Sequence, residues 1–491
     1  MLNWLDSRTG LVTMAKDFLT EDIPGGASYW YVFGSATMFA MIMQIATGIF
    51  LTFFYAPSAA TAWESTVAIY NNPFQHMVLS LHYWGSSAMI ALVFLHLLQV
   101  LIWGAYKSPR ELQWVVGVVL LVVTLVLGLT GYLLPWDMNA YFASQVALNI
   151  TGTAPIAGSL MQNIAQGGGT MGTETINRFF GLHVWLMPAV LIALVGMHLA
   201  IFRHNGGAGP ISDDPRKLKV GRFFPDQIFM DTVGAIAVFA VIYALAYFAP
   251  PFLDEKADPT VTTFIPYPAW YFLSLFGMLT LVPAQFELLA TIVVPTLFIL
   301  VVFALPWIDR STTRNIGARL PIIWGTVITV AVIVGLSIYS QISITAKEAA
   351  APPSKPQAQI LAEANAATMA PAVAGATGAA GAAAGPMPGA SVYKQNCSSC
   401  HGANGEGMPG AFPPLAGNAT VTGDPGKVIG ILLNGLQGKI HVGSSDYNGM
   451  MPAWKGNLTN QQIADVITYI RGGLGPNKAA AVDVKAVNGF K

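Results

Sequence analysis

Seven long apolar stretches lie within the first 342 residues of this chain of 491 residues. Each is close to the roughly 20 residues that an α-helix needs to cross about 30 Å of hydrocarbon. The clearest stretch, residues 115–134, contains no charged residue. Only 10% of all residues are charged, against about 25% in soluble proteins. We therefore expect an all-α membrane protein, with spans at 30–54, 77–104, 114–134, 180–202, 230–249, 286–308 and 320–342.

Basic residues in the loops predict how these spans are oriented. Twelve Lys and Arg residues fall on one side of the membrane and two, Arg178 and Lys256, on the other. Cytoplasmic loops are enriched in Lys and Arg, so the N-terminus is predicted to be cytoplasmic and everything after Ile344 to lie outside. We see no cleavable signal peptide, and the net charge of zero gives no sign of a nucleic-acid partner. The twelve residues are Arg8, Lys16, Lys107, Arg110, Arg203, Arg216, Lys217, Lys219, Arg222, Arg310, Arg314 and Arg319.

Composition divides the chain into four segments. Residues 1–220 hold the first four spans, and residues 221–345 hold the last three. Residues 346–390 are mainly Ala, Pro and Gly, a composition typical of flexible linkers. Residues 391–491 have ordinary polarity, and we expect them to fold as a small all-α domain.

Four histidines lie inside the second and fourth spans, where ionisable residues are costly and usually functional. His82 and His96 are fourteen residues apart, and His183 and His198 are fifteen apart, which is roughly 21 to 23 Å along a helix. Fourteen steps return to nearly the same helix face, and a kink at Pro188 could absorb the extra residue of the second pair. Both spans cross in the same direction, so His82 should lie level with His183, and His96 with His198. Two imidazoles at each level suit bis-histidine ligation of a haem inside a four-helix bundle.

Glycines in the first and third spans repeat this spacing. Gly34 and Gly48 are fourteen residues apart, as are Gly117 and Gly131. The lack of side chains at two matched levels would make room for two flat macrocycles. Glycine is also common where membrane helices pack together, so each glycine alone is weak evidence. All four together favour two haems b.

At this point the chain resembles a known family, the cytochrome b of Rieske-type quinol-oxidising complexes, over about residues 1–344. The chain has three spans after the histidine-bearing spans, and fifteen residues separate His183 from His198. In both respects it is most similar to the short chloroplast cytochrome b joined to its subunit IV. The segments that carry the resemblance are IATGIFLTFFY at 45–55, SPRELQWVVGVV at 108–119, GYLLPWDMNAY at 131–141, NRFFGLHVWLMPAVL at 177–191, and DEKADP followed by PAWYF within 254–272.

The resemblance implies roles for individual residues. His82 and His183 would hold the haem on the outer, quinol-oxidising side, and His96 and His198 the inner haem. The outer quinol site would be formed by the segment from Pro135 to Tyr141 and by four consecutive residues in the loop before the sixth span. That set is Pro268, Ala269, Trp270 and Tyr271.

Two positions depart from the family. Ala269 stands where the family usually has Glu, and a methyl group cannot accept the quinol proton. Tyr271, Glu255, Asp258 or water would have to do so. Val32 stands where chloroplast-type relatives attach an extra haem through cysteine, which argues against a third haem in the membrane.

The C-terminal domain carries its own motif, Cys397-Ser-Ser-Cys400-His401. Two thiols followed by histidine are typical of covalently attached haem c. A redox dithiol is conceivable, whereas a zinc site would need more ligands. Met451, which precedes Pro452, is the expected sixth ligand and Met450 its rival, because the segment resembles class I bacterial cytochromes c. Methionine–histidine ligation generally raises the potential.

Together these features predict a quinol:cytochrome c oxidoreductase subunit in a bacterial cytoplasmic membrane, with its cytochrome c domain on the periplasmic side. The resemblance implies that one electron passes through a Rieske iron–sulfur protein to the tethered haem c. The other electron crosses the two haems b to quinone, and protons are translocated. Further expected partners are a second copy of the chain and a periplasmic or membrane cytochrome or terminal oxidase as acceptor. The alternatives are a non-bifurcating dihaem quinol dehydrogenase, and a seven-span transporter or channel with a sensor cytochrome and no haem b.

Overall fold

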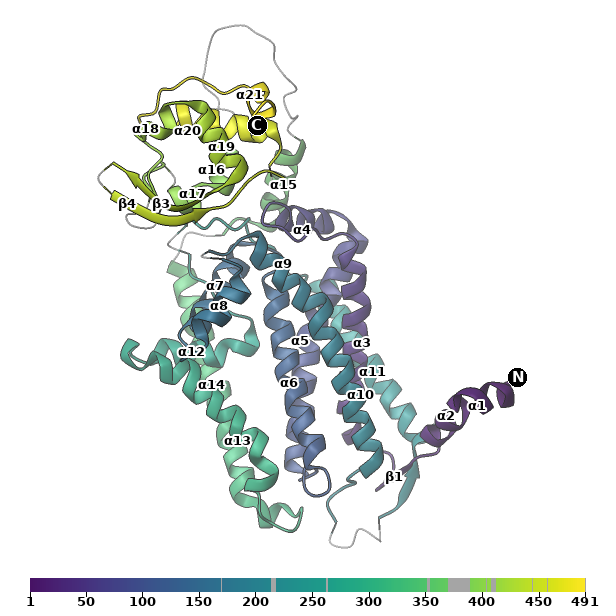
Figure 1. Ribbon diagram of the computed structural model, residues 1–491. Coiled ribbons are helices and arrows are strands. Elements are labelled where there is room, and N and C mark those ends of the chain that lie inside the picture. The colour runs from purple at the N-terminus through teal and green to yellow at the C-terminus, as the bar shows by residue number, and fades with distance from the viewer. Residues whose placement is uncertain are drawn as a thin grey trace. The chain divides into compact units, whose positions relative to one another are not determined.

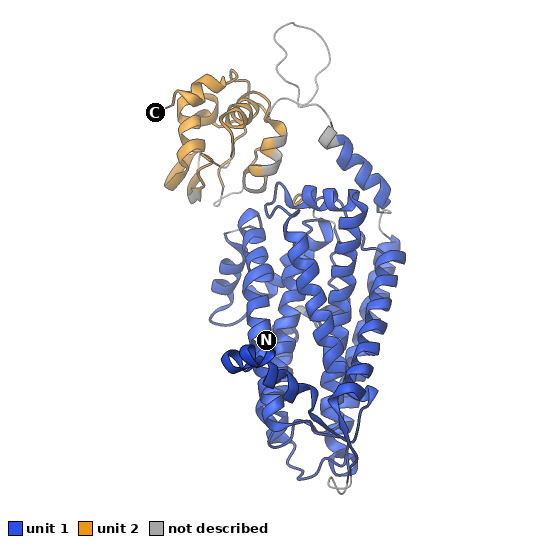
Figure 2. Cartoon of the chain, turned by 90° about the vertical axis from the view of Figure 1, so that its right-hand side faces the viewer, with its two compact units in different colours: residues 1–257, 264–370 blue, residues 258–263, 371–491 orange. Residues whose placement is uncertain are grey.

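The computed structural model describes residues 1–168, 170–212, 218–261, 264–350, 354–369, 389–402, 404–407, 412–443, 445–456 and 458–490. The chain forms two compact units (Figure 2). Unit 1 contains residues 1–257 and 264–370, and unit 2 contains residues 258–263 and 371–491.

Within the described residues, seven helical segments are long and apolar enough to cross a membrane. The predicted number of spans is therefore confirmed, and each segment overlaps one predicted stretch. Several are longer than predicted because their polar ends remain helical. They are Tyr29–Thr52, Pro73–Ile102, Glu111–Tyr132, Thr173–Asn205, Phe223–Phe248, Leu289–Ile308 and Ile316–Ala350.

Four of these helices run side by side as a bundle (Figure 1). They are α3 (Val32–Thr52), α5 (Pro73–Ile102), α6 (Glu111–Tyr132) and α10 (Met187–Asn205). Each contributes to one buried cluster through Ala40, Met89, Val123 and Leu191 respectively. A further helix, α11 (Ile228–Phe248), packs against α3 and α5. The many exposed apolar side chains on the outer helix faces suit a bilayer as the surrounding solvent.

At one end of unit 1, which we call the basic end, arginines tie three loops together. Arg314 donates from Nε to the carbonyl of Trp103 at 3.0 Å and from Nη2 to that of Gly209 at 2.7 Å. Arg110 donates from Nε to the carbonyl of Gly206 at 3.1 Å. Two short strands, β1 (Asp22–Pro24) and β2 (Val220–Arg222), also pair antiparallel in unit 1. Loops that were predicted to share one side of the membrane thus meet in the structure.

Short helices gather at the opposite end. They are α4 (Ala62–Asn71), α7 (Met138–Gly152), α8 (Gly158–Gln166) and α9 (Thr173–Gly181). Their apolar faces share one buried cluster with the loop at residues 249–257, to which α4 is also tied by a hydrogen bond from an indole N–H to a carbonyl. The first four spans therefore carry a structured cap at this end.

The three helices that follow α11 and its loop pack against the bundle and one another. The indole of Trp114 on α6 donates to the carbonyl of Val302 on α13 (Val294–Ile308) at 2.8 Å. Ser340 on α14 (Leu320–Ala350) donates to the carbonyl of Leu273, the first residue of α12 (Leu273–Leu281), at 2.7 Å. These contacts attach the C-terminal helices to one another and to the dihistidine bundle.

The prediction of a flexible linker over 346–390 is wrong for its first half. Helix α14 continues to Ala350, and a further helix, α15 (Gln357–Met369), packs on unit 1. Ile360 and Ala364 are 2% and 7% exposed within the cluster at the opposite end. Alanine is the strongest helix former, so an alanine-rich segment becomes a helix where an apolar surface receives it. Residues 370–388 lie outside the described residues.

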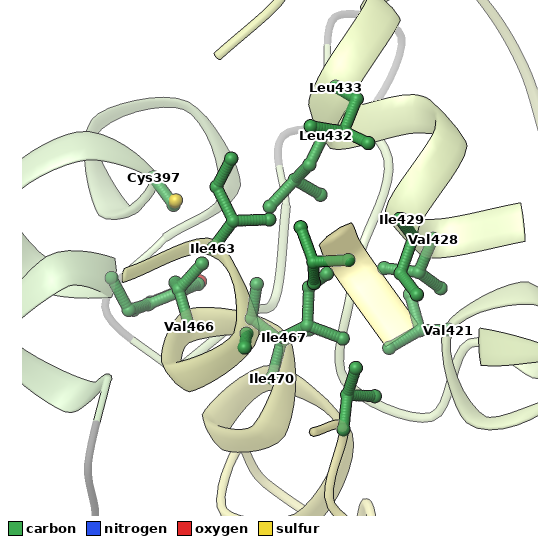
Figure 3. Packing of buried hydrophobic residues seen from close by; sticks show 14 of the residues in the cluster. Cys397, Val421, Val428, Ile429, Leu432, Leu433, Ile463, Val466, Ile467 and Ile470 are labelled. Atoms are coloured by element: carbon green, nitrogen blue, oxygen red, sulfur yellow. The ribbon is translucent and has the colours of Figure 1, made fainter. Parts of the chain in front are cut away.

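Unit 2 is mostly helical around one apolar core, part of which Figure 3 shows. Its longest helix, α20 (Asn460–Gly472), begins with a capping box between Thr459 and Gln462. A β-hairpin of β3 (Leu436–Val442) and β4 (Ser445–Met451) departs from the predicted all-α domain. The other helices are α16 (Ala390–Asn396), α17 (Ser398–His401), α18 (Ala419–Thr422), α19 (Pro425–Asn434) and α21 (Val484–Asn488).

Candidate functional site

His82 on α5 and His183 face each other across the bundle. Their ring centres are 6.1 Å apart and their planes are 78° apart. A metal with two axial nitrogens at about 2 Å, each about 1.1 Å from its ring centre, requires about 6 Å between the rings. Within the described residues no group of three His, Cys, Asp or Glu side chains could hold a metal ion, so a metal between these two rings would need further ligands from a cofactor. This fits a haem iron held between the two rings.

Hydrogen bonds determine which nitrogen of each ring is available to a metal at this level. Thr47 Oγ1 lies 2.9 Å from His82 Nδ1 and gives its own hydrogen to the carbonyl of Met43 at 2.7 Å. The imidazole must therefore donate from Nδ1, which leaves the lone pair of Nε2 for iron. His183 likewise donates from Nδ1 to the carbonyl of Leu127 at 3.0 Å.

The second level is built from His96 and His198, which lie close enough to interact electrostatically. His96 Nδ1 lies 3.3 Å from Oε1 of Gln99, which is the acceptor. The buried ring of His198 lies against the backbone of Gln113, which interacts with it by a hydrogen bond. The two levels thus share their ligand type but differ in the hydrogen bonds behind the ligands.

The four glycines lie against the four imidazoles, one to each. A β-carbon on Gly48 would lie 3.2 Å from Cε1 of His82, and one on Gly131 would lie 2.5 Å from Cε1 of His183. The corresponding distances at the other level are 3.4 Å for both pairs, which are Gly34 with His96 and Gly117 with His198. The glycines predicted to make room for a cofactor therefore also make room for its ligands.

The extra residue between His183 and His198 is absorbed by a π-helical turn, η2 (Leu182–Leu186), which contains His183. In a π turn the backbone hydrogen bond joins residues five apart, whereas in an α turn it joins residues four apart, so a π turn contains one additional residue. Fifteen positions on this helix therefore match fourteen on α5. The turn ends directly before α10, whose second residue is Pro188, where the missing N–H and the ring of proline disfavour a regular α turn. From the sequence we had expected a kink at this proline to absorb the extra residue; the structure shows a π turn in front of it.

An apolar cavity of about 220 Å³ opens beside the His82–His183 level. Its wall includes Pro268, Ala269 and Tyr271 from the segment before α12, and small side chains of α7 such as Ala147. Among the residues that line it, hydroxyls come from Tyr132, Tyr267, Tyr271 and Thr291, and none is a carboxylate.

Helix α6 connects the cavity to the histidines. A β-carbon on Gly128 would lie 2.7 Å from the hydroxyl oxygen of Tyr271, whereas Gly131 touches His183. Residues three apart share one helix face. The cavity and the His82–His183 level therefore border the same stretch of α6.

The motif of unit 2 lies in the core of that unit. Cys397 is 8% exposed, and Figure 3 shows its sulfur near Ile463 and Val466 of α20. His401 is 6% exposed and donates from Nδ1 to the carbonyl of Pro413 at 2.9 Å, which leaves Nε2 for a metal. Met451, the last residue of β4, packs against the same core. The side chains of Cys400 and Met450 lie outside the described part of the structure.

Three family models match the chain. "Cytochrome b(N-terminal)/b6/petB" covers residues 87–256, and "Cytochrome b(C-terminal)/b6/petD" covers residues 256–351. "Cytochrome c" covers residues 386–473. The boundary between the first two models falls in the loop that follows α11.

Known proteins match the same region. The menaquinol:cytochrome c reductase cytochrome b subunit of Bacillus subtilis (strain 168) is 39% identical over 218 residues, which are 43% of this chain and 97% of that protein. Cytochrome b of Allochromatium vinosum is 31% identical over 360 residues, which are 68% of this chain and 87% of that protein. This chain belongs to the cytochrome b family. A solved structure titled "Hyperthermophilic respiratory Complex III" matches this cytochrome b with a TM-score of 0.62 and 27% identity, covering 74% of this chain and 95% of that one.

Two of the predicted quinol-site residues of this cytochrome b do not line the cavity. Trp270 is 47% exposed, and its indole donates to Ser87 Oγ at 3.3 Å. Tyr141 is 3% exposed and packs edge-on against Trp136, behind the cavity wall. Their roles stay predictions.

The carboxylates considered as replacements for the usual glutamate lie elsewhere. Glu255 pairs with Lys355 at 2.6 Å and does not line the cavity. Asp258 accepts hydrogen bonds from the backbone and hydroxyl of Thr260.

Two threonines behind the histidines were not predicted from the sequence. Thr47 precedes Gly48 and Thr130 precedes Gly131, and each threonine hydroxyl lies near the histidine of its level, at 2.9 and 3.3 Å from Nδ1. The repeated Thr-Gly pair is a signal that could have identified them. The cavity wall on α7 had no such signal, because that helix lies outside the periodic spans.

Proposed function

We propose that this cytochrome b is the quinol-oxidising subunit of a quinol:cytochrome c reductase, with the cavity beside Tyr271 as its quinol site. The observation that supports this most directly is the shared face of α6, where Gly128 contacts Tyr271 and Gly131 contacts His183. A quinol head group in this cavity would lie beside the first histidine level.

The cavity has the chemistry that a quinol ring needs. Its lining is mainly aliphatic and aromatic, so it excludes water and accepts an apolar ring. The hydroxyl of Tyr271 has no hydrogen-bond partner in the described part of the chain and lines the cavity, so it can bind one quinol oxygen. Small residues of α7 leave space for the ring.

Four histidines would hold two haems b, as His82 with His183 and His96 with His198. Cys397 and Cys400 would attach one haem c, with His401 and Met451 as its axial ligands. When bound, these haems supply one-electron carriers. The chain's own residues set the imidazole tautomers through Thr47, Leu127 and Gln99.

We further propose a Rieske iron–sulfur protein and a second copy of the chain as partners in a bacterial cytoplasmic membrane. The basic end would face the cytoplasm, in line with the twelve basic residues predicted for that side. Because α14 runs away from this end, the tether to the cytochrome c domain would begin outside the cytoplasm. Electron transfer would then move protons outward and pass electrons to a cytochrome or terminal oxidase.

Filling the cavity tests the proposal. In the purified complex we expect Ala147→Phe to reduce the oxidation of a short-chain quinol, with soluble cytochrome c as the acceptor, by at least about tenfold while haem b content stays unchanged. Asn149→Phe adds a similar ring to an exposed position of α7 outside the cavity and should leave the rate unchanged. Equal rates for wild type and Ala147→Phe would overturn this assignment of the quinol site.

A further inference from the structure

The cavity lacks a base for the proton that quinol oxidation releases. The described residues of its lining offer hydroxyls but no carboxylate, and Ala269 contributes only a methyl group. A tyrosine with an ordinary pKa of about 10 is protonated at neutral pH and is a poor proton acceptor. A carboxylate close to the cavity, reached through its hydroxyls, would meet this need.

Asp137 is such a carboxylate. It is 7% exposed, and it precedes α7, the helix that forms one wall of the cavity. Its Oδ1 accepts from the backbone N–H of Ala140 at 2.8 Å and its Oδ2 from that of Asp254 at 3.2 Å. Capping of α7 accounts for the first of these bonds, but burial of a whole carboxylate is more than a cap requires, since most caps remain partly solvated.

A single residue, Asn139, connects Asp137 to the cavity. The backbone N–H of Asn139 points at the Asp137 carboxylate. Its side-chain amide donates to the hydroxyl of Tyr132 and to the carbonyl of Tyr267. Tyr132 and Tyr267 both line the cavity, and the Tyr132 hydroxyl donates to the Tyr267 carbonyl at 3.0 Å. The carboxylate and the Tyr132 hydroxyl therefore lie on either side of one asparagine.

On its other side, Asp137 adjoins a route to solvent. Asp254 is half-buried, and its own carboxylate accepts from the backbone N–H of Glu255 at 2.8 Å. The side chain of Glu255 is 48% exposed. Burial thus decreases stepwise from Asp137 through Asp254 to Glu255, away from the cavity.

We propose that Asp137 receives the quinol proton from the cavity through the Tyr132 hydroxyl and water, and passes it by way of Asp254 to the surrounding water. This inference rests on the proposed quinol site. The O–H bond of the quinol breaks, and an O–H bond forms on the Asp137 carboxylate, which becomes neutral. Transfer to Asp254 restores its charge. This step accounts for one of the two quinol protons, and the two electrons pass to the acceptors of the proposed function, which are the Rieske protein and the haem that His82 and His183 would hold.

The electrostatic surroundings of Asp137 support this role. Burial, together with the nearby Asp254 carboxylate, raises its pKa to about 6 against the opposing hydrogen bonds from the backbone of Ala140, Asp254 and Asn139. The titratable groups that interact with it are Asp254 and the phenols of Tyr70, Tyr132 and Tyr267. Lys256 lies opposite Asp137 in an antiparallel backbone bridge, and its ammonium group pairs with Glu64 at 2.5 Å. A base with a pKa close to the working pH can both take up and release a proton.

The pH dependence of quinol oxidation tests the proposal in the purified complex, with a short-chain quinol and soluble cytochrome c. Wild-type activity should fall as the pH drops through about 6, because protonated Asp137 accepts no proton. Asp137→Asn keeps an oxygen that can cap α7 but has no basic group. We expect it to lower kcat by about 10- to 100-fold, to leave KM for quinol unchanged and to lose the acidic limb near pH 6. Asp137→Glu should restore the limb.

The alternative is a purely structural role for Asp137. It predicts that Asp137→Asn lowers haem b content or the unfolding temperature while the remaining activity keeps its acidic limb, and either that result or unchanged kcat would overturn the proposal. If the Asn variant fails to assemble, Tyr132→Phe decides, because the relay requires a fall in kcat without a change in KM and the structural role requires no change. A wild-type complex that oxidises no quinol would refute the proposed function itself.

Discussion

Gly131 and His183 are in direct contact across two helices: a β-carbon on Gly131 would lie 2.5 Å from Cε1 of the His183 ring. Ordinary contacts of a β-carbon are at least about 3.4 Å, so even one methyl group must push the imidazole away. We expect Gly131→Ala to weaken binding of the haem at the His82–His183 level. The ratio of haem b extracted into organic solvent to covalent haem c should fall by about half.

Gly181→Ala is the matched control for this change. Gly181 lies two residues before His183, and a β-carbon there would meet nothing within 4 Å. Alanine in an open helical position costs nothing and removes backbone freedom from the unfolded chain, so the control should retain full haem b. Equal haem b content in both variants would show that the His183 ring tolerates the displacement.

Thr47 orients His82, and its removal should change a redox potential. The hydroxyl oxygen of Thr47 accepts from Nδ1 of His82, which makes the imidazole a stronger donor to iron and favours the oxidised state. Thr47→Val should therefore raise the midpoint potential of the haem at this level by roughly 20 to 40 mV, the equivalent of one net hydrogen bond. A redox titration of the haem b absorbance measures the shift.

Thr37 provides the control on the same helix. Its hydroxyl donates to the carbonyl of Phe33 at 2.8 Å, as that of Thr47 does to Met43. No hydrogen bond to a histidine is present at Thr37 in the described structure. Thr37→Val should leave both potentials where they are, and a shift of the same size in both variants would assign the effect to helix packing.

Helix α15 should dock only while its apolar side is intact. Ile360 is 2% exposed, whereas Ala362 on the same helix is exposed. An unpaired charge is costly to bury, so we expect Ile360→Asp to detach α15 and Ala362→Asp to leave it in place. Hydrogen exchange followed by mass spectrometry should show faster exchange of residues 357–369 in Ile360→Asp alone. Unchanged protection there would mean that the polar contacts of Lys355 and Gln357 suffice for docking.

The membrane spans and the levels of the histidines and glycines could be predicted because helical periodicity converts sequence spacing into position. Fourteen residues place two side chains on one face of a helix whatever surrounds it. The structure pairs each of Gly34, Gly48, Gly117 and Gly131 with one histidine, a detail consistent with that reasoning. The roles of these residues as cofactor ligands stay predictions.

Other features depend on tertiary contacts that periodicity does not record. The π turn around His183 forms directly before Pro188, where proline disfavours a regular α turn, and the spacing of apolar residues does not record it. Helix α15 forms because Leu253 and its neighbours offer an apolar surface, and alanine-rich composition alone cannot distinguish a helix from a linker. Asp137 lies in the segment that the resemblance assigns to the quinol site, but a role as a base could not be predicted, because a carboxylate next to a turn is usually a solvated cap and only the fold buries it.

At the basic end, Asp309 should determine how this unit withstands acid. Its Oδ2 accepts from Arg319 Nε at 2.9 Å, from the Tyr106 hydroxyl at 2.5 Å and from Lys107 Nζ at 3.0 Å. Burial alone would raise the pKa of Asp309, but the hydrogen bonds from Tyr106, Arg319 and Lys107 outweigh it and hold the pKa well below its usual range. The side chain of Arg319 is 0% exposed, so the loss of its partner leaves a buried charge unpaired.

Asp309→Asn should therefore destabilise unit 1 by about 3 to 5 kcal/mol at neutral pH, seen as a lower temperature of haem b release on heating. Because the folded pKa lies below the unfolded value, the stabilisation is complete above about pH 4 and is lost as the pH falls through the folded pKa. The difference between variant and wild type should accordingly shrink below pH 4. Glu21→Gln, which breaks the more exposed pair with Arg203, should cost less than about 1 kcal/mol. A gap between Asp309→Asn and wild type that stays constant down to pH 3 would mean that the aspartate acts through its shape and not through its charge.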